Sequence, residues 1–239
     1  MNIINSLISC FFPNVCAGCG EVLKGEDHFC DYCFEMMERV PIDKICKKCG
    51  LPKKNCDCGK YIFHFDSCVA PFRNDGVART AMHKFKFNHK ERLGYYFAEQ
   101  MVLSIKQRYY EYDFDLITFV PMRKADELAR GYNQSFVLAN RISKILNIPL
   151  AQNILKCNKK QNKQHTLSRK DRFENIKGVF YCNAKLSGKR ILLVDDIKTT
   201  GATLDACAKE LYAAGADSVC CVTGLITYKD KDKNKKKGK

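Results

Sequence analysis

Beyond residue 65 the apolar positions follow two different periods, which predicts alternating strands and helices. Short continuous apolar runs predict strands at 66–72, 116–121, 149–155, 179–182, 190–194 and 218–226. Helical stripes of apolar residues predict helices at 76–87, 91–110, 133–146 and 202–214. A polar and basic stretch at 161–175 predicts a long loop. This alternation is typical of an α/β fold with a parallel, doubly wound sheet.

The N-terminal quarter follows another pattern, in which cysteines replace the apolar runs. Nine of the 15 cysteines lie within residues 1–62, and eight of these nine form four close pairs. The first two pairs read C-x2-C-x10-C-x2-C, and the last two read C-x2-C-x6-C-x-C. Close pairs beside glycines are typical of zinc knuckles, in which the backbone turns sharply and both thiolates reach one ion. The predicted metal ligands are Cys16, Cys19, Cys30, Cys33, Cys46, Cys49, Cys56 and Cys58.

The spacing leaves the pairing of these thiolates open. Sequential pairing gives two four-cysteine sites, whereas interleaved pairing also uses all four pairs. A disulfide framework is typical of secreted proteins, but nothing indicates secretion and the number of cysteines is odd. An iron–sulfur site is a further alternative, although its usual spacings are absent from the sequence. A segment this short and this poor in apolar residues is expected to fold around its metal, so the predicted role of Zn²⁺ is structural.

The charge balance points to polyanionic partners. Lysine and arginine outnumber aspartate and glutamate by 41 to 26, which gives a formal net charge of +15. Such an excess favours nucleic acid, phosphorylated metabolites or acidic lipid. Residues 229–239 hold seven lysines and two aspartates, a run typical of disordered chain. No stretch approaches the roughly 20 apolar residues of a membrane span, and the apolar opening at 3–12 lacks the features of a signal peptide, so we expect a cytoplasmic protein.

The segment 191–203 reads Ile-Leu-Leu-Val-Asp-Asp-Ile-Lys-Thr-Thr-Gly-Ala-Thr and indicates a ligand site. Its four apolar residues carry Asp195 and Asp196 to the carboxyl end of a predicted strand, where open α/β sheets bind ligands. The loop that follows opens a helix, whose N-terminus offers amide hydrogens and a positive dipole to a phosphate. The carboxylates can accept hydrogen bonds from two sugar hydroxyls or hold Mg²⁺ through water. Together these features predict a site for a ribose that carries a 5-phosphate.

Two other interpretations of this segment stay open. Receiver-type domains also carry an acidic pair at a strand end, although they lack the Thr-Thr-Gly-x-Thr loop. The loop alone is also compatible with an ordinary helix cap, in which a threonine is the capping residue. Under the ribose-phosphate interpretation, the predicted phosphate-binding residues are Lys198, Thr199, Thr200, Gly201, Ala202 and Thr203.

Two basic clusters lie outside this segment. One follows the predicted strand at 116–121, at the same sheet edge in a doubly wound fold, where arginine and lysine can hold a pyrophosphate. The other lies in the predicted loop at 161–175, and long polar loops inside compact domains are often lids or binding loops. A solvated basic surface is the alternative for each cluster. The candidate pyrophosphate or lid residues are Arg123, Lys124, Arg130 and Arg169.

The segment 191–203 resembles the phosphoribosyl pyrophosphate (PRPP) motif of type I phosphoribosyltransferases, and the chain over about residues 10–227 resembles the ComF (ComFC) family. The matching features, in the family's order, are Phe12-Pro13 with Cys16-Ala-Gly-Cys19-Gly20, the segment from Val120-Pro121 to Gln134, the segment 164–180 and the loop 195–203. The resemblance implies a zinc ribbon module at 1–62, single or double. It also implies a type I phosphoribosyltransferase-like parallel sheet with flanking helices at 63–228, followed by a disordered tail at 229–239.

The resemblance further implies binding of PRPP or ribose 5-phosphate, with Mg²⁺, through Asp195, Asp196 and the loop 199–203. It implies a role in natural competence, in which imported single-stranded DNA is handled inside the cell. Asp126 departs from the family pattern, because it lies in a stretch that is often more basic in relatives.

The sequence leaves enzymatic activity open. Phosphoribosyl transfer displaces pyrophosphate from C1 of PRPP through an oxocarbenium-like state, and Asp195 and Asp196 fit the positioning of ribose and metal. No segment indicates an acceptor base, and proteins with this fold also bind PRPP as a regulatory ligand. The hypotheses are a competence factor associated with single-stranded DNA, an active phosphoribosyltransferase of nucleotide metabolism, and a zinc-stabilised scaffold for a DNA-uptake helicase. Aromatic residues beside basic ones, at 85–87 and 108–110, suit the first hypothesis, with core packing as the alternative.

Overall fold

The centre of the molecule is a parallel sheet. The computed structural model describes residues 13–87, 91–110, 113–158 and 169–229. The strand order is β1-β7-β6-β3, formed by β1 (Ser67–Val69), β7 (Ser218–Ile226), β6 (Arg190–Lys198) and β3 (Leu116–Phe119). The short strand β2 (Phe72–Arg73) also pairs with β7. The predicted parallel sheet is confirmed.

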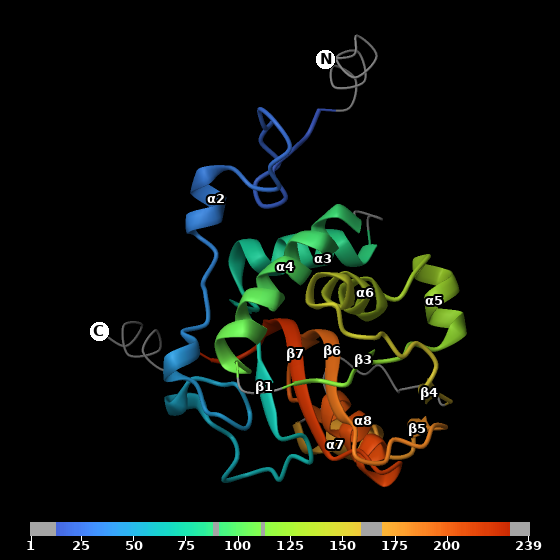
Figure 1. The fold of residues 1–239 in the computed structure, drawn as a ribbon. Coiled ribbons are helices and arrows are strands. Elements are labelled where there is room, and N and C mark those ends of the chain that lie inside the picture. The colour runs from blue at the N-terminus through green and yellow to red at the C-terminus, as the bar shows by residue number, and fades with distance from the viewer. Residues whose placement is uncertain (1–12, 88–90, 111–112, 159–168, 230–239) are drawn as a thin grey trace.

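Helices cover both faces of this sheet (Figure 1). On one face α4 (Glu91–Arg108) packs against β7 and α6 (Gln134–Leu146) against β6 and β3, with α3 (Gly76–Phe87) beside α4. On the other face α8 (Ala202–Ala213) packs against β6 and β7, with α7 (Arg169–Asn175) beside it. Residues 191–194 of β6 are therefore fully buried, which explains their continuous apolar run.

Strand β6 continues past its predicted end at residue 194. It stays paired with β7 through Asp195↔Thr223 and as far as Lys198↔Ile226. This pairing holds the two carboxylates on the strand itself, so that their backbone is fixed by the sheet rather than carried by a loop.

Two other predicted strands have the wrong bounds. The strand predicted at 66–72 is divided into β1 and β2, with Pro71 between them, because proline lacks the N–H that a ladder needs. The strand predicted at 149–155 begins only at its last residue, as β4 (Leu155–Cys157), and Leu150 forms an isolated bridge to Ile117. Strand β4 pairs antiparallel with β5 (Phe180–Cys182), outside the main sheet.

Among the described residues from 113 to 229, two short helices lie where no helix was predicted. Helix α5 (Lys124–Arg130) is ended by Gly131 with a φ of 86°, a left-handed conformation that glycine adopts readily. Helix α7 occupies the end of the predicted loop at 161–175, and its Phe173 ring stacks on Tyr61 at 5.2 Å between centroids. Short helices depend on such tertiary contacts rather than on their own propensity. Residues 159–168, the apolar opening at 3–12 and the tail at 230–239 lie outside the described residues.

The cysteine-rich segment packs against the sheet domain. It contains α2 (Asp31–Glu35) and the 3-10 turns η1 (Ile42–Lys44) and η2 (Lys53–Asn55). A Cβ added at Gly50 would lie 2.4 Å from the carbonyl oxygen of Cys68 in β1, so the backbones meet closely. One hydrophobic core includes Cys16, Cys33 and Cys49 together with the sheet, and it is continuous across the domain boundary predicted at 62/63. Among the described residues, no helix is long and apolar enough to cross a membrane.

Candidate functional site

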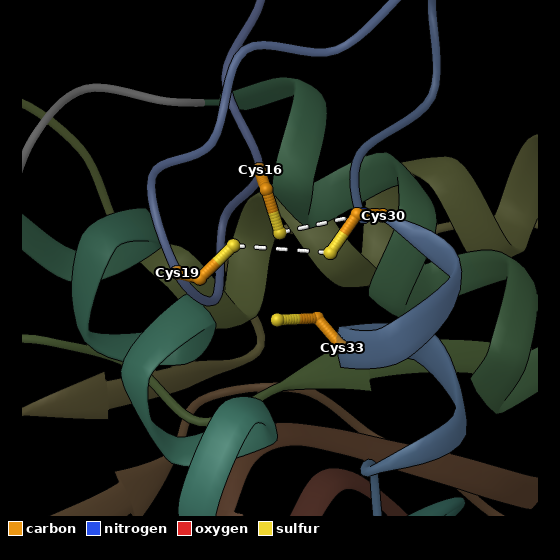
Figure 2. Close-up of side chains that lie close together, drawn as sticks. All are labelled: Cys16, Cys19, Cys30 and Cys33. Atoms are coloured by element: carbon orange, nitrogen blue, oxygen red, sulfur yellow. Dashed lines mark hydrogen bonds between the residues drawn. The ribbon is translucent and has the colours of Figure 1, made fainter.

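The eight predicted cysteine ligands form two separate groups. Within each group, all four Sγ atoms lie within 4.8 Å of one another. Figure 2 shows the sulfurs of the first group pointing toward a common centre, with Cys33 contributed by α2. The cysteines are thus grouped in sequential order in space, and not in the interleaved order. The groups are Cys16, Cys19, Cys30 and Cys33, and Cys46, Cys49, Cys56 and Cys58.

The spacing of the sulfurs fits a tetrahedral metal site. The Sγ atoms of Cys19 and Cys30 are 3.8 Å apart, and the same separation joins Cys46 to Cys58 in the second group. Thiolates that surround Zn²⁺ at about 2.3 Å form a tetrahedron with edges of about 3.8 Å. A disulfide would need an S–S distance of about 2.05 Å. The cysteines among the described residues are free thiols, and both groups can hold Zn²⁺.

Backbone amides favour the thiolate form of one cysteine in each group. Burial opposes ionisation of Cys16, but backbone hydrogen bonds, with the Cys30 amide at 3.4 Å first among them, lower its pKa to about 6. Burial also opposes ionisation of Cys46, but the backbone amides of Cys49 and Lys48 lower its pKa to about 7. Since the thiolate is the metal-binding form, the folded backbone itself prepares these groups for zinc.

Asp195 and Asp196 lie toward the carboxyl end of β6 and line a cleft of about 190 Å³. Asp195 Oδ1 accepts a hydrogen bond from Ser135 Oγ at 2.8 Å and another from the Asp196 amide at 2.9 Å. Burial, followed by the neighbouring charge of Asp196, raises the pKa of Asp195 to about 7. Asp195 therefore holds its proton more tightly than an ordinary aspartate does.

Asp196 forms an ion pair that the sequence did not predict. Its Oδ2 atom lies 2.5 Å from Nζ of Lys86, and both side chains are mostly buried, at 13% and 19% exposure. Lys86 belongs to the last turn of α3. In the sequence, Lys86 stands out only as part of the aromatic and basic stretch 85–87, a pattern that suits nucleic-acid binding. In the fold, however, Phe85 is fully buried and Lys86 lines the cleft.

The residues at 132–135 connect the elements around the cleft. Tyr132 Oη donates to the carbonyl of Phe85, and Gln134 Nε2 donates to the carbonyl of Lys86 at 3.4 Å. Asn133 caps α6 by accepting from the Ser135 amide at 2.9 Å, and its Nδ2 donates to the carbonyl of Val120 at 3.2 Å. This segment thus holds α3, α6 and the chain just after β3 together around the carboxylates.

Two of the four predicted basic residues, Arg123 and Arg130, line the cleft. Arg123 Nε forms an ion pair with Asp126 at 2.8 Å. Asp126, the residue that departs from the family pattern, thus supplies a partner for Arg123 from within α5. The guanidinium of Arg130 lies 5.4 Å from the centroid of the Phe87 ring. Lys124 is exposed and lines a neighbouring groove instead, while Arg169 begins α7 and its side chain lies outside the described residues.

The predicted phosphate loop leads into the same cleft. Gly201, with a φ of 88°, is the N-cap of α8, and Thr203 in the first turn lines the cleft. Thr200 Oγ1 accepts from the Ala202 amide at 3.3 Å, which holds the turn, while Thr199 is exposed. The first amides of a helix have no acceptor within that helix. The N-terminus of α8 therefore offers an anion site beside the carboxylates.

Lys198 lies beneath this loop rather than in the cleft. Its side chain is fully buried, and its Nζ lies 5.6 Å from the centroid of the Phe63 ring. Among the described residues, this Nζ has no hydrogen-bond partner. A Cβ added at Gly201 would lie 3.1 Å from both Phe63 Cε1 and Lys198 Cε, so Phe63 and Lys198 form a tight support under the loop.

Comparison with known proteins agrees with this geometry. A model of the phosphoribosyl transferase domain matches residues 132–239. Competence protein F of Haemophilus influenzae is 27% identical over 211 residues, which cover 86% of this chain and 87% of that protein. Competence protein ComFC of Bacillus subtilis is 25% identical over 205 residues, covering 81% of this chain and 82% of that protein. This chain is a homologue of the ComF proteins. The DNA utilization protein YhgH of Escherichia coli is 25% identical over 183 residues, covering 73% of this chain and 81% of that protein.

The cleft of this ComF homologue extends beyond the matched domain. Ser135, both aspartates and Thr203 belong to residues 132–239, whereas Lys86 precedes them in the chain. The resemblance to the ComF family and the expected phosphoribosyltransferase-like sheet with flanking helices are confirmed.

Proposed function

We propose that this protein binds PRPP or ribose 5-phosphate through Asp195, Asp196 and the loop 199–203, and that it acts in natural competence. The observation that carries the proposal is the junction of two carboxylates with the N-terminus of α8 in one cleft. Two neighbouring ribose hydroxyls donate to the carboxylate oxygens. The 5-phosphate accepts from the first amides of α8 and from Thr203.

Each residue of the cleft has a separate task in this proposal. Ser135 orients Asp195 toward the ribose through its 2.8 Å hydrogen bond. Gly201 lets the phosphate loop pack closely on Phe63 and Lys198, because a side chain there would meet both residues. Arg130 lies on the cleft wall formed by α5 and would face the pyrophosphate of PRPP. Mg²⁺, when it accompanies PRPP, would neutralise part of the pyrophosphate charge, and Asp195 and Asp196 are the groups to hold it through water.

The competence role is supported by the relatives and by the charge of the chain. Competence protein F, ComFC and YhgH carry names that refer to competence or to DNA utilization. The net charge of +15 favours a polyanion. Each aromatic pair noted in the sequence has one exposed member, Phe87 and Tyr110, at 51% and 76% exposure, whereas Phe85 and Tyr109 are core residues. Exposed rings beside arginines can stack on the bases of single-stranded DNA.

Both cysteine groups bind Zn²⁺ in this proposal, and the metal has a structural role. Each group supplies four thiols and no open position for a substrate, which is the composition of structural zinc sites. The first group packs against α3, since a Cβ at Gly18, between Cys16 and Cys19, would lie 2.9 Å from Val77 in α3.

An active phosphoribosyltransferase is the second candidate. A groove of about 550 Å³ adjoins the cleft and shares Arg123 and Asn133 with it. The groove also contains the amides of Gln152 and Asn153 and the ring of Tyr181. Amides and an aromatic ring beside the ribose site suit a planar acceptor base, which favours transfer over binding alone.

Calorimetry with zinc-loaded protein tests the ligand proposal. We expect ribose 5-phosphate to bind at least tenfold more tightly than ribose, because charged hydrogen bonds at the helix N-terminus contribute about 1.5–3 kcal/mol. Equal affinity for the two sugars would contradict the phosphate site. Release of pyrophosphate from PRPP with a panel of bases then separates an active transferase from a protein that only binds the ligand.

A further inference from the structure

The amine of Lys86 contacts the Asp195–Asp196 pair. A cation is needed at this place if the cleft is to bind a phosphorylated sugar. Two adjacent carboxylates in one cleft repel a phosphate, and a divalent cation is a common means of neutralising them. Here Nζ of Lys86 is already 2.5 Å from Oδ2 of Asp196. The positive charge of Lys86 also opposes the rise in the pKa of Asp195, so it acts on both acids.

Hydrogen bonds to the backbone on either side of the Lys86 Cα hold this residue in position. The side chains of Tyr132 and Gln134 donate hydrogen bonds to the last carbonyls of α3, those of Phe85 and Lys86. The ring of Phe85 is fully buried against the core. Lys86 is therefore anchored on both sides of its Cα, and its amine is kept at the carboxylates by elements packed around it.

The remaining charges of the cleft are paired or lie on its wall. Arg123 forms an ion pair with Asp126. Arg130 lies against the Phe87 ring. Lys86 is thus the cation in direct contact with the Asp195–Asp196 pair among the described residues. Without it, this pair would be an uncompensated acidic site, and removal of one partner of a mostly buried ion pair is costly.

We propose that Lys86 is the resident counter-cation of Asp195 and Asp196, so that this cleft binds ribose 5-phosphate without a divalent cation. The inference rests on the proposed function, because it concerns the same ligand. It makes Lys86 a ligand-positioning residue that acts through Asp196. The amine fixes this carboxylate in place, while its charge offsets that of the acids toward the incoming phosphate.

Calorimetry with ribose 5-phosphate tests the inference on the full-length, zinc-loaded protein. Divalent cations are removed from the buffer with a chelating resin before the protein is added, because a soluble chelator would also take Zn²⁺ from the cysteine groups. We expect the wild-type protein to bind ribose 5-phosphate with the same affinity, within twofold, with and without added Mg²⁺.

The Lys86→Met variant is expected to behave differently, because methionine keeps the length of the side chain without its charge. In metal-free buffer its affinity should fall by about tenfold or more, the scale of a charge-assisted hydrogen bond, and added Mg²⁺ should restore it. Lys84→Met is the matched control, since Lys84 lies in the same turn of α3 but does not line the cleft.

Mn²⁺ supplies a readout that does not need the sugar. Electron paramagnetic resonance should detect a bound Mn²⁺ in Lys86→Met that is absent from the wild type, from Lys84→Met and from Lys86→Met combined with Asp196→Asn. Wild-type binding of ribose 5-phosphate only in the presence of Mg²⁺ would overturn the inference and leave the proposed function standing. Equal affinity of wild type and Lys86→Met in metal-free buffer would also overturn it. No binding in either buffer would overturn the proposed function, and the inference with it.

Discussion

Ser135 donates a hydrogen bond to Asp195 across 2.8 Å, and this bond joins the two elements that form the floor of the cleft. Ser135 lies in the first turn of α6, whose cap is Asn133, while Asp195 lies on the central strand β6. The bond lowers the pKa of Asp195 and so counteracts burial, which raises it. The orientation and the charge of Asp195 therefore depend on a residue 60 positions away in the chain.

Replacement of Ser135 by alanine should weaken ligand binding without unfolding the protein. The variant removes the donor, so Asp195 is freer to rotate and its pKa rises further. We expect the affinity for ribose 5-phosphate to fall about threefold to tenfold at pH 7, the scale of one hydrogen bond. Calorimetry measures this change, and an unaltered melting curve serves as the control for the fold. An affinity equal to that of the wild type would show that Asp195 needs no orienting partner.

The double variant Asp195→Asn, Asp196→Asn should abolish binding of PRPP and ribose 5-phosphate. Asparagine keeps the size of each side chain but removes the charge that pairs with Lys86 and one of the acceptors for the ribose hydroxyls. Replacement of both by alanine should abolish binding as well, but with lower stability, because it also removes the side-chain oxygens that contact Lys86 and Ser135. Unchanged affinity in the asparagine variant, measured by calorimetry, would refute the assignment of the site.

Stability should depend on pH through Asp195. Its pKa in the folded protein is raised to about 7, whereas an ordinary aspartate titrates near 4. The folded state thus holds this proton more tightly than the unfolded state does, so the contribution is fully present below about pH 4 and is lost as the pH rises toward 7. Denaturation by urea between pH 5.5 and 8, with zinc present, should show a steeper loss in the wild type than in Asp195→Asn. Parallel curves for the two proteins would contradict the raised pKa.

Loss of the second cysteine group should destabilise the whole molecule. Cys49 is fully buried in the same core as β1, and Gly50 next to it packs on the carbonyl of Cys68. We expect Cys49→Ser to shift one cooperative melting transition to lower temperature. Cys19→Ser, at an exposed ligand of the first group, serves for comparison. Two separate transitions in Cys49→Ser, with the later one unchanged, would instead support an independent module that ends at residue 62.

The sequence predicted the elements whose pattern is strong. Helix 76–87 and strand 218–226 have the predicted bounds, because their apolar faces are packed as their periods require. Helices α5 and α7 were missed, since each spans only seven residues, most of them charged or polar, and both depend on contacts that periodicity does not contain. The cysteine groups were predictable because metal ligands must be close in sequence within each knuckle.

The sequence predicted only those cleft residues that lie close together along the chain. Asp195, Asp196 and Thr203 follow one another along the chain, so a local motif reveals them. Lys86 and Ser135 reach the same place from α3 and α6, and only the packing of these helices on the sheet brings them there. Lys198 shows the opposite case, because it lies within the motif but faces Phe63 beneath the loop. Sequence neighbours on a strand face opposite sides, and the motif alone does not say which side each occupies.

A crystal structure of the zinc-loaded protein with ribose 5-phosphate tests the central claim most directly. We predict that the phosphate lies on the first amides of α8 beside Thr203, that the ribose hydroxyls contact Asp195 and Asp196, and that Lys86 keeps its contact with Asp196. Ribose 5-phosphate bound elsewhere on the molecule, with the cleft between β6 and α3 filled by water alone, would contradict it.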